Sequence, residues 1–387
     1  MVRSWVYGKK PGLSSLPAFT SLGVMGVQSH WPPVVRIAWS TGGVVAVNEP
    51  GPDVIVMAGF GGPEIQRLRI VSFDALFAVL YNEGLPTLGA TFAQTPEEFQ
   101  GIRPPEFRAM SVTCDSWLVR EAQQKWREIA FGAWRAGRMD LLDISSRIAS
   151  GLLYSEMRLS DLVNAYSSQL RGRAPTGGSK TYERFKDLNA PWVYKSIHAL
   201  FWELAVLRDS LAQFAAVFCF SRTEIKSMKG LRGHLVNSRL ADPLADEILR
   251  ASDPANSGWV ARFSSYRNLF THLAPMEQAA GSAFVVQDLR ELRSGLKIPQ
   301  MFYALPGNVE EIVSKRSKGT LFGTPQELTD ATARHPKRGS DLDALEYLHS
   351  SIDRFTKLSH SLILRSPIAP EPIKIGPNDL RGPVQVT

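Results

Sequence analysis

The segment from about Pro191 to Phe220 constrains the fold most, because it predicts a helix that is apolar on almost every side. Six large apolar side chains recur on one stripe at three- and four-residue spacing: Leu200, Leu204, Leu207, Leu211, Phe214 and Phe218. Trp202, Val206 and Val217 cover much of the opposite side. A helix that is apolar all round packs in a protein interior. We therefore expect this helix at the centre of the fold, with other helices around it.

The charges on this helix exclude a membrane span. Glu203, Arg208 and Asp209 lie within it, and such charges are costly at the centre of a bilayer. Buried charges have to be paired or face a cleft. The adjacent Arg208 and Asp209 are therefore more typical of an ion pair than of a catalytic site, and we expect no membrane contact.

Helical periodicity dominates after residue 108. Further helices are expected at about 116–136, 140–153, 159–170, 258–273 and 341–364. A connector at about 279–337 mixes short helical and extended pieces, including a strand-like run at 298–305, and a Pro-rich tail covers 367–387. Residues 109–366 thus predict a helical domain with an inserted connector.

The first 108 residues differ in character, since they are rich in Gly and Pro and contain short β-branched runs. These runs lie at 34–37, 44–47, 53–57 and 68–73. They predict a small β-rich or α+β unit in front of the helices, and a chain of 387 residues is long enough for two such units. The fold class we expect is mainly α.

No metal or cofactor site is expected. Cys114 and Cys219 lie in apolar sequence without a Cys or His at metal-ligand spacing, so both are interpreted as reduced and buried. His335, His349 and His360 also lack that spacing and are expected on the surface.

One segment carries a chemical signature: Tyr-Arg-Asn-Leu-Phe-Thr-His at 266–272. Ser257 is the expected N-cap of its helix, and Pro275 should end the helix close to His272. In a regular α-helix, Arg267 and His272 would lie about 7.5 Å apart along the axis and about 140° apart around it. We therefore expect them to line one edge of a groove without touching each other.

The order Arg267, Asn268, three residues and His272 resembles the Arg-polar-x-His motif of the HEPN superfamily. This resemblance implies an antiparallel helical bundle and RNA cleavage without a metal, by attack of the 2′-hydroxyl on the adjacent phosphate. It also implies a homodimer, in which two motif helices form one composite groove. Families of this kind serve as toxins and in anti-phage defence.

The residue types suit that chemistry. An imidazole such as that of His272 moves protons in either direction near neutral pH. Arg267 would hold the phosphate and stabilise the charge on its oxygens, and Asn268 would orient His272 or bond a phosphate oxygen. Three charged residues of the long helix are weaker candidates for supporting positions behind the motif: Glu203, Arg208 and Asp209.

A basic stretch at 222–239 contains five Lys or Arg residues and one acidic residue, Glu224. Such a stretch is somewhat more typical of a solvated surface than of an RNA-binding one. The net charge of +7 nevertheless favours acidic partners. Four residues are the candidates for RNA binding: Arg222, Lys226, Lys229 and Arg232.

These features predict a cytoplasmic endoribonuclease that acts on RNA, with an antitoxin or another defence-system protein as a further partner. The alternatives are a HEPN-like module that binds nucleic acid or a nucleotide, or assembles, without catalysis, and an oligomeric scaffold. In a purely structural role, Arg267 would pair with a surface carboxylate and His272 would cap helix carbonyls.

Overall fold

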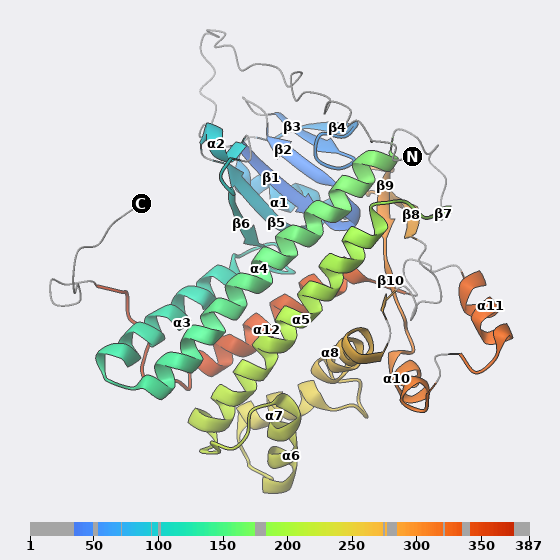
Figure 1. Ribbon diagram of the computed structural model, residues 1–387. Helices are drawn as coiled ribbons and strands as arrows, with labels where there is room; N and C mark the ends of the chain where they lie inside the picture. Colours follow the sequence, from blue (N-terminus) through green and yellow to red (C-terminus); the bar gives the residue numbers. More distant parts are fainter. Residues whose placement is uncertain are drawn as a thin grey trace, which may run out of the picture.

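The computed structural model describes residues 35–48, 53–70, 72–93, 95–99, 102–174, 183–273, 275–276, 285–319, 322–334 and 341–374. Within these ranges, an antiparallel sheet lies at one end of a set of long helices, and short helices lie at the other end (Figure 1). The protein is mainly α, with a substantial sheet. None of the helices in this part of the chain is both long enough and apolar enough for a membrane crossing.

The six-stranded sheet has the order β4-β3-β2-β1-β5-β6, and all neighbouring strands are antiparallel. Its strands are β1 (Val35–Ser40), β2 (Val45–Asn48), β3 (Asp53–Met57), β4 (Glu64–Arg69), β5 (Thr87–Ala93) and β6 (Glu106–Ala109). The expected runs at 34–37, 44–47 and 53–57 overlap β1, β2 and β3, whereas 68–73 straddles the end of β4 and the start of a helix, α1 (Phe73–Asn82). β5 and β6 were not expected, because β5 is rich in small residues. One of them, Gly89, leaves no room for a Cβ beside the Phe107 ring on β6.

Four long helices form the body of the molecule: α3 (Leu118–Arg135), α4 (Met139–Arg173), α5 (Ala190–Phe214) and α12 (Ala344–Ile363). α4 packs against both α3 and α5, and α12 packs across α3, α4 and α5. The expectation of two helices at 140–153 and 159–170 was wrong, because α4 is continuous. The intervening residues contain no Gly or Pro that would end a helix.

α5 is buried on one side only, whereas the sequence predicted a helix surrounded by other helices. Leu200, Leu204 and Leu211 are fully buried, whereas Trp202 is 52% exposed and Val206 is 49% exposed. A π-helical turn, η2 (Ala215–Cys219), extends α5 close to the expected end of the helix. α5 therefore has a buried stripe and an apolar stripe that faces solvent.

Short helices cover the far end of α5 (Figure 1). They are α6 (Met228–Ser238), α7 (Pro243–Ser252) and α8 (Trp259–Asn268), which continues as a π-helical turn, η3 (Leu269–Leu273). α6 and α7 were not predicted. α8 and η3 match the expected helix at 258–273, but the N-cap is Gly258 and not Ser257, which has a left-handed φ of 53°.

The connector contributes to the fold as short elements. They are β8 (Val285–Glu291), β9 (Lys297–Phe302), β10 (Ala304–Leu305), α10 (Val309–Ser317) and α11 (Pro325–Ala333). β8 pairs with both β9 and β7 (Glu183–Phe185) in a second antiparallel sheet, and β10 pairs with β11 (Leu342–Asp343). Two further elements of the N-terminal part are η1 (Thr41–Gly43) and α2 (Pro96–Phe99).

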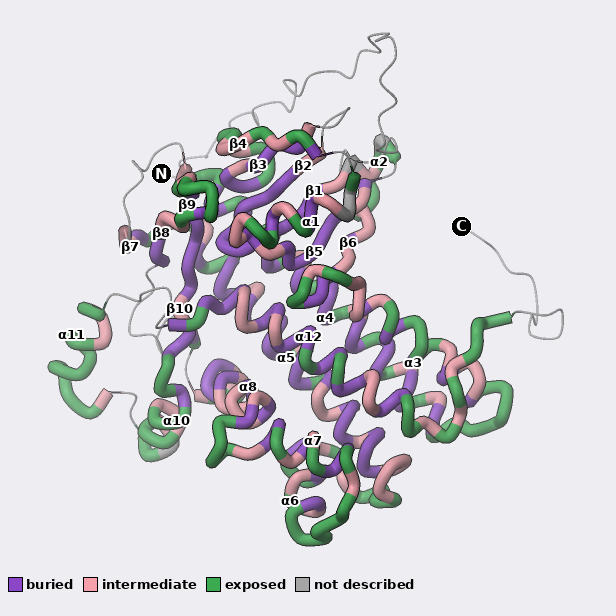
Figure 2. Tube along the Cα trace, turned by 180° about the vertical axis from the view of Figure 1, so that it is seen from behind, coloured by how far each residue is buried: buried purple, intermediate pink, exposed green. Residues whose placement is uncertain are grey.

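One apolar core joins the sheet to the helices. It extends from Val45 in β2 to Leu204 in α5 and Phe355 in α12. Figure 2 shows buried residues both on the strands and on the inner sides of the long helices. Gly43, with a φ of 88°, lies close against α4, because a Cβ there would be 2.7 Å from the carbonyl oxygen of Tyr166. The residues before and after position 108 therefore share one core.

Candidate functional site

Aromatic packing fixes the motif helix. The Phe263 and Phe270 rings lie 5.6 Å and 5.2 Å from the Phe201 ring on α5. Tyr266 is fully buried, and its hydroxyl donates a hydrogen bond of 2.9 Å to the carbonyl oxygen of Pro306. The face of the helix that carries Phe263, Tyr266 and Phe270 is thereby held in the core. The polar motif residues lie outside that core.

The π-helical turn η3 brings two motif side chains together. A Nη1 atom of Arg267 lies 2.7 Å from Nε2 of His272. The expectation that these residues would not touch was wrong, because it assumed a regular α-helix from end to end. In a π-helix the backbone bond joins residue i to residue i+5, so side chains five positions apart come to the same face. Arg267 and His272 have that spacing.

The hydrogen bond between them fixes the roles of its atoms. A guanidinium only donates, so Nε2 of His272 accepts, and the neutral ring carries its proton on Nδ1. The same Nη1 lies 3.3 Å from Oδ1 of Asn268. Arg267, Asn268 and His272 together form the motif cluster. Asn268 and His272 are exposed and Arg267 is half-buried, so the motif cluster is open to solvent.

The Arg267 guanidinium contacts no carboxylate of the described residues. It lies over the exposed ring of Trp202, 5.7 Å from the ring centre. Its Nε is buried and has no hydrogen-bond partner among the described residues. Arg267 thus makes no surface ion pair within the described chain, and no carbonyl there accepts a hydrogen bond from His272.

Arg208 and Asp209 form the ion pair that their sequence indicates, with two contacts of 3.0 Å. Arg208 also donates to the hydroxyl of Ser264 on α8 at 2.9 Å, and Asp209 accepts from the backbone N–H of Met228 at 3.3 Å. The pair therefore ties α5 to α6 and α8. It positions the motif helix and does not join the motif cluster.

Glu203 also lies apart from the motif cluster. Partial burial raises its pKa, and the opposing effect comes from Arg158 on α4. No hydrogen bond within the described chain links Glu203 to Arg267 or His272. Glu203 therefore has no role in the geometry of the motif.

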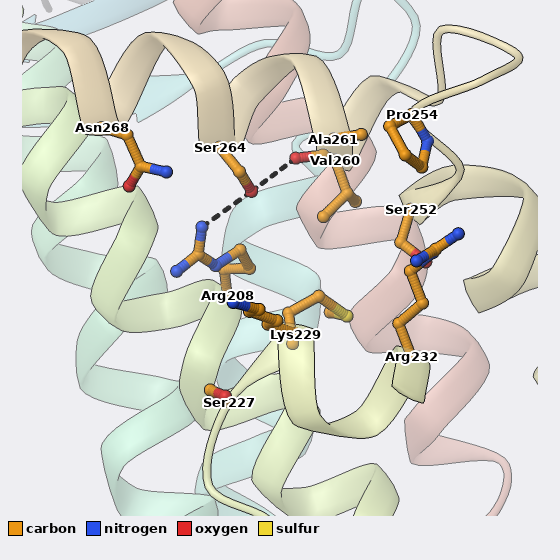
Figure 3. Close-up of a pocket in the computed structure, with 11 residues that line it drawn as sticks. Arg208, Ser227, Lys229, Arg232, Ser252, Pro254, Val260, Ala261, Ser264 and Asn268 are labelled. Carbon is orange, nitrogen blue, oxygen red and sulfur yellow. Dashed lines mark hydrogen bonds between the residues drawn. The ribbon is translucent and has the colours of Figure 1, made fainter. Parts of the chain in front are cut away.

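The candidate RNA-binding residues divide into two groups. Lys229 and Arg232 line a pocket together with Arg208 and Asn268 (Figure 3). Arg222 and Lys226 are exposed and do not line it. This pocket could not be predicted from the sequence without α6, which forms one of its walls. A signal was present, since Ser227 is a favourable N-cap before Leu231 and Leu235 at helical spacing.

The remaining titratable candidates do not form a site. Cys114 and Cys219 are free thiols but only partly buried, and burial raises the pKa of Cys219 to about 11. His349 is buried and not on the surface as expected, because its Nε2 lies 2.6 Å from the carbonyl oxygen of Met110. His360 is half-buried, and His335 lies outside the described residues. The described segments contain no group of three or more His, Cys, Asp or Glu residues that would hold a metal ion.

Comparisons with protein-family models, with curated proteins and with solved structures found no match for this chain. The resemblance to the HEPN superfamily therefore rests on the motif residues alone. The function has to be inferred from those residues and from their surroundings in the fold.

Proposed function

We propose that the protein is a metal-independent endoribonuclease, with Arg267, Asn268 and His272 as its catalytic residues. The observation that carries this proposal is the exposed 2.7 Å contact between Nη1 of Arg267 and Nε2 of His272. The pair places a permanent cation beside an imidazole, and no carboxylate of the described residues is bound to the cation, so a phosphodiester that displaces this contact would meet both groups.

In the proposed reaction, an RNA phosphate takes over the hydrogen bonds of the Arg267 guanidinium. Nε2 of His272 then has a free lone pair and accepts the proton of the 2′-hydroxyl. The 2′-oxygen forms a bond to phosphorus, and the bond from phosphorus to the 5′-oxygen breaks. The products are a 2′,3′-cyclic phosphate and a 5′-hydroxyl. Arg267 stabilises the negative charge on the equatorial oxygens, and Asn268 orients the guanidinium.

A homodimer completes this scheme, because the departing 5′-oxygen needs a proton. A second imidazole, from His272 of another copy, would donate it. The exposed apolar side chains beside the motif support an interface there, since Trp202 lies under Arg267 and Val206 follows one turn later on α5. We also propose membership of the HEPN superfamily, a cytoplasmic location, and a toxin or anti-phage role with a regulatory protein partner.

The test is cleavage of single-stranded RNA by the purified protein in a chelator. We expect cleavage, and we expect His272→Ala to slow it by at least about 100-fold, because that is the usual size of a general acid–base contribution. His234→Ala on α6 is the matched control, since among the described residues the His234 side chain contacts only the hydroxyl of Ser238. Full cleavage by the His272 variant would eliminate the proposal.

A second candidate function is binding without cleavage. One observation favours it: the lone pair of His272 Nε2 already accepts a bond from Arg267, so the free protein holds no available base at that atom. In that case wild-type protein would bind RNA, with an affinity that falls steeply as salt rises, and would leave it intact.

A further inference from the structure

A second cationic feature lies beside the motif and is not needed for the proposed cleavage. It is a pocket of about 310 Å³ between α5, α6, α8 and the turn that precedes α8. Figure 3 shows Arg208, Lys229 and Arg232 reaching it from α5 and α6. This volume is at the lower end of the range for pockets that hold small organic ligands.

The pocket is positively charged. Three cations line it, and no Asp or Glu does. Asp209 neutralises Arg208, but Lys229 has no ion-pair partner among the described residues. Arg232 approaches its nearest carboxylate, Asp253, only to 3.9 Å. Two positive charges are therefore poorly compensated.

Arg232 provides an independent sign of a missing acceptor. Its Nε atom is buried and has no hydrogen-bond partner within the described chain. A buried N–H on a charged group is costly when it is left unpaired. The accessible part of the same side chain lines the pocket, so an anion there would compensate the charge of this guanidinium.

The first turn of α6 strengthens the case. A helix N-terminus carries a partial positive charge that favours acidic residues, yet this turn has none and carries Lys229 instead. The hydroxyl of Ser227 accepts from the backbone N–H of Gly230, and the carboxylate of Asp209 accepts from that of Met228. A bound anion would compensate the charge of Lys229, which has no such partner among the described residues.

The other wall of the pocket is apolar and accommodates more than a bare anion. Val260, Ala261 and Pro254 line it opposite the cations. We infer that the pocket binds a phosphate monoester with a small organic part, of the size of a nucleotide. Asn268 lines this pocket and also contacts Arg267, so the ligand lies next to the motif.

Adenosine 5′-monophosphate is the probe, with adenosine as the uncharged control, and calorimetry measures binding to the His272→Ala protein. We expect saturable binding of the phosphorylated compound only. Lys229→Gln and Arg232→Gln should each weaken it about 10-fold, since each removes a charged hydrogen-bond donor. Lys226→Gln removes the same charge from an exposed position outside the pocket and should change the affinity less than about twofold.

Equal weakening by Lys226→Gln, or equal binding of adenosine, would overturn the inference. A second arm compares RNA oligonucleotides with a 5′-phosphate and with a 5′-hydroxyl. Tighter binding of the phosphorylated oligonucleotide, lost in Lys229→Gln, identifies the ligand as an RNA end; binding of the mononucleotide alone identifies it as a free nucleotide. Binding is measured on the His272→Ala protein, which is expected not to cleave RNA. An absence of nucleotide binding would therefore not count against the proposed cleavage, and an absence of cleavage would not count against nucleotide binding.

Discussion

Two polar clusters in this molecule differ in how far their hydrogen-bonding groups are buried and paired. Where the long helices meet the sheets, Tyr303 donates to Gln169 at 2.6 Å, Asp343 accepts from the backbone N–H of Tyr303 at 2.9 Å, and all three side chains are buried. On α8, Arg267 and His272 bond each other at 2.7 Å but open to solvent. The buried cluster satisfies its own members, whereas the exposed one keeps donors that a ligand can use.

Buried and exposed polar clusters contribute differently to stability and to function. A buried polar network contributes stability when every member is paired, and its loss is felt by the whole fold. An exposed pair on a rigid helix contributes little to stability, so a function explains it better. Substitutions in the two clusters should therefore have opposite effects on activity and on unfolding.

The largest effect is expected at Arg267. Arg267→Ala should slow RNA cleavage by about 100-fold or more, because it removes the donors that stabilise the charged transition state. Its free energy of unfolding should change by less than about 0.5 kcal/mol. Arg267→Lys should restore only part of the rate, since it keeps the charge without the planar fork. Cleavage assays measure the rate and urea unfolding measures the stability. A large loss of stability in Arg267→Ala would contradict the distinction between the exposed pair and the buried cluster.

The next effect is expected at Asp343, which caps α12 through Leu345 and Glu346 and also accepts from Tyr303. Asp343→Ala should lower the free energy of unfolding by about 3 kcal/mol, because a helix cap is lost and a buried N–H is left unpaired. Cleavage by the folded variant should be unchanged.

Asp242→Ala is the matched control, since Asp242 caps α7 in the same way but near the surface, where it pairs with Arg365. It should cost about 1 kcal/mol. Equal losses in the two variants, measured by urea unfolding, would show that the buried network adds nothing beyond the cap.

The smallest effect concerns pH. Burial raises the pKa of Glu156 from 4.5 to about 7, against the opposing influence of Arg120 and the backbone N–H of Ala109. Between these values the folded state holds a proton that the unfolded state has lost, so stability should fall as pH rises from 4.5 through 7. Glu156→Gln should make the thermal unfolding midpoint less dependent on pH between 4.5 and 7. An unchanged pH dependence in this variant would argue against the raised pKa.

The sequence predicted the features that local patterns encode. The stripe from Leu200 to Phe214 located α5, and the helical periodicity at 258–273 located α8 and η3. Pro275 correctly indicated that the helix ends near His272. Short-range periodicity and a proline are sufficient for these elements, because both act through neighbouring residues.

The rest depends on tertiary packing. The π-helical turn at Leu269–Leu273 shifts the backbone bonding by one residue, and no residue type marks it in advance. His349 looked like a surface residue because its partner, the carbonyl of Met110, is far away in sequence. α6 and α7 are short, and their few apolar positions gave too little periodicity to detect.

The most direct test of the central claim is the chemistry of the ends that the purified protein leaves on a defined RNA in the presence of a chelator. Attack by the 2′-oxygen predicts 2′,3′-cyclic phosphate and 5′-hydroxyl ends from the wild type and essentially none from His272→Ala. Ends carrying a 5′-phosphate, or the same cyclic products from the His272 variant, would contradict the account.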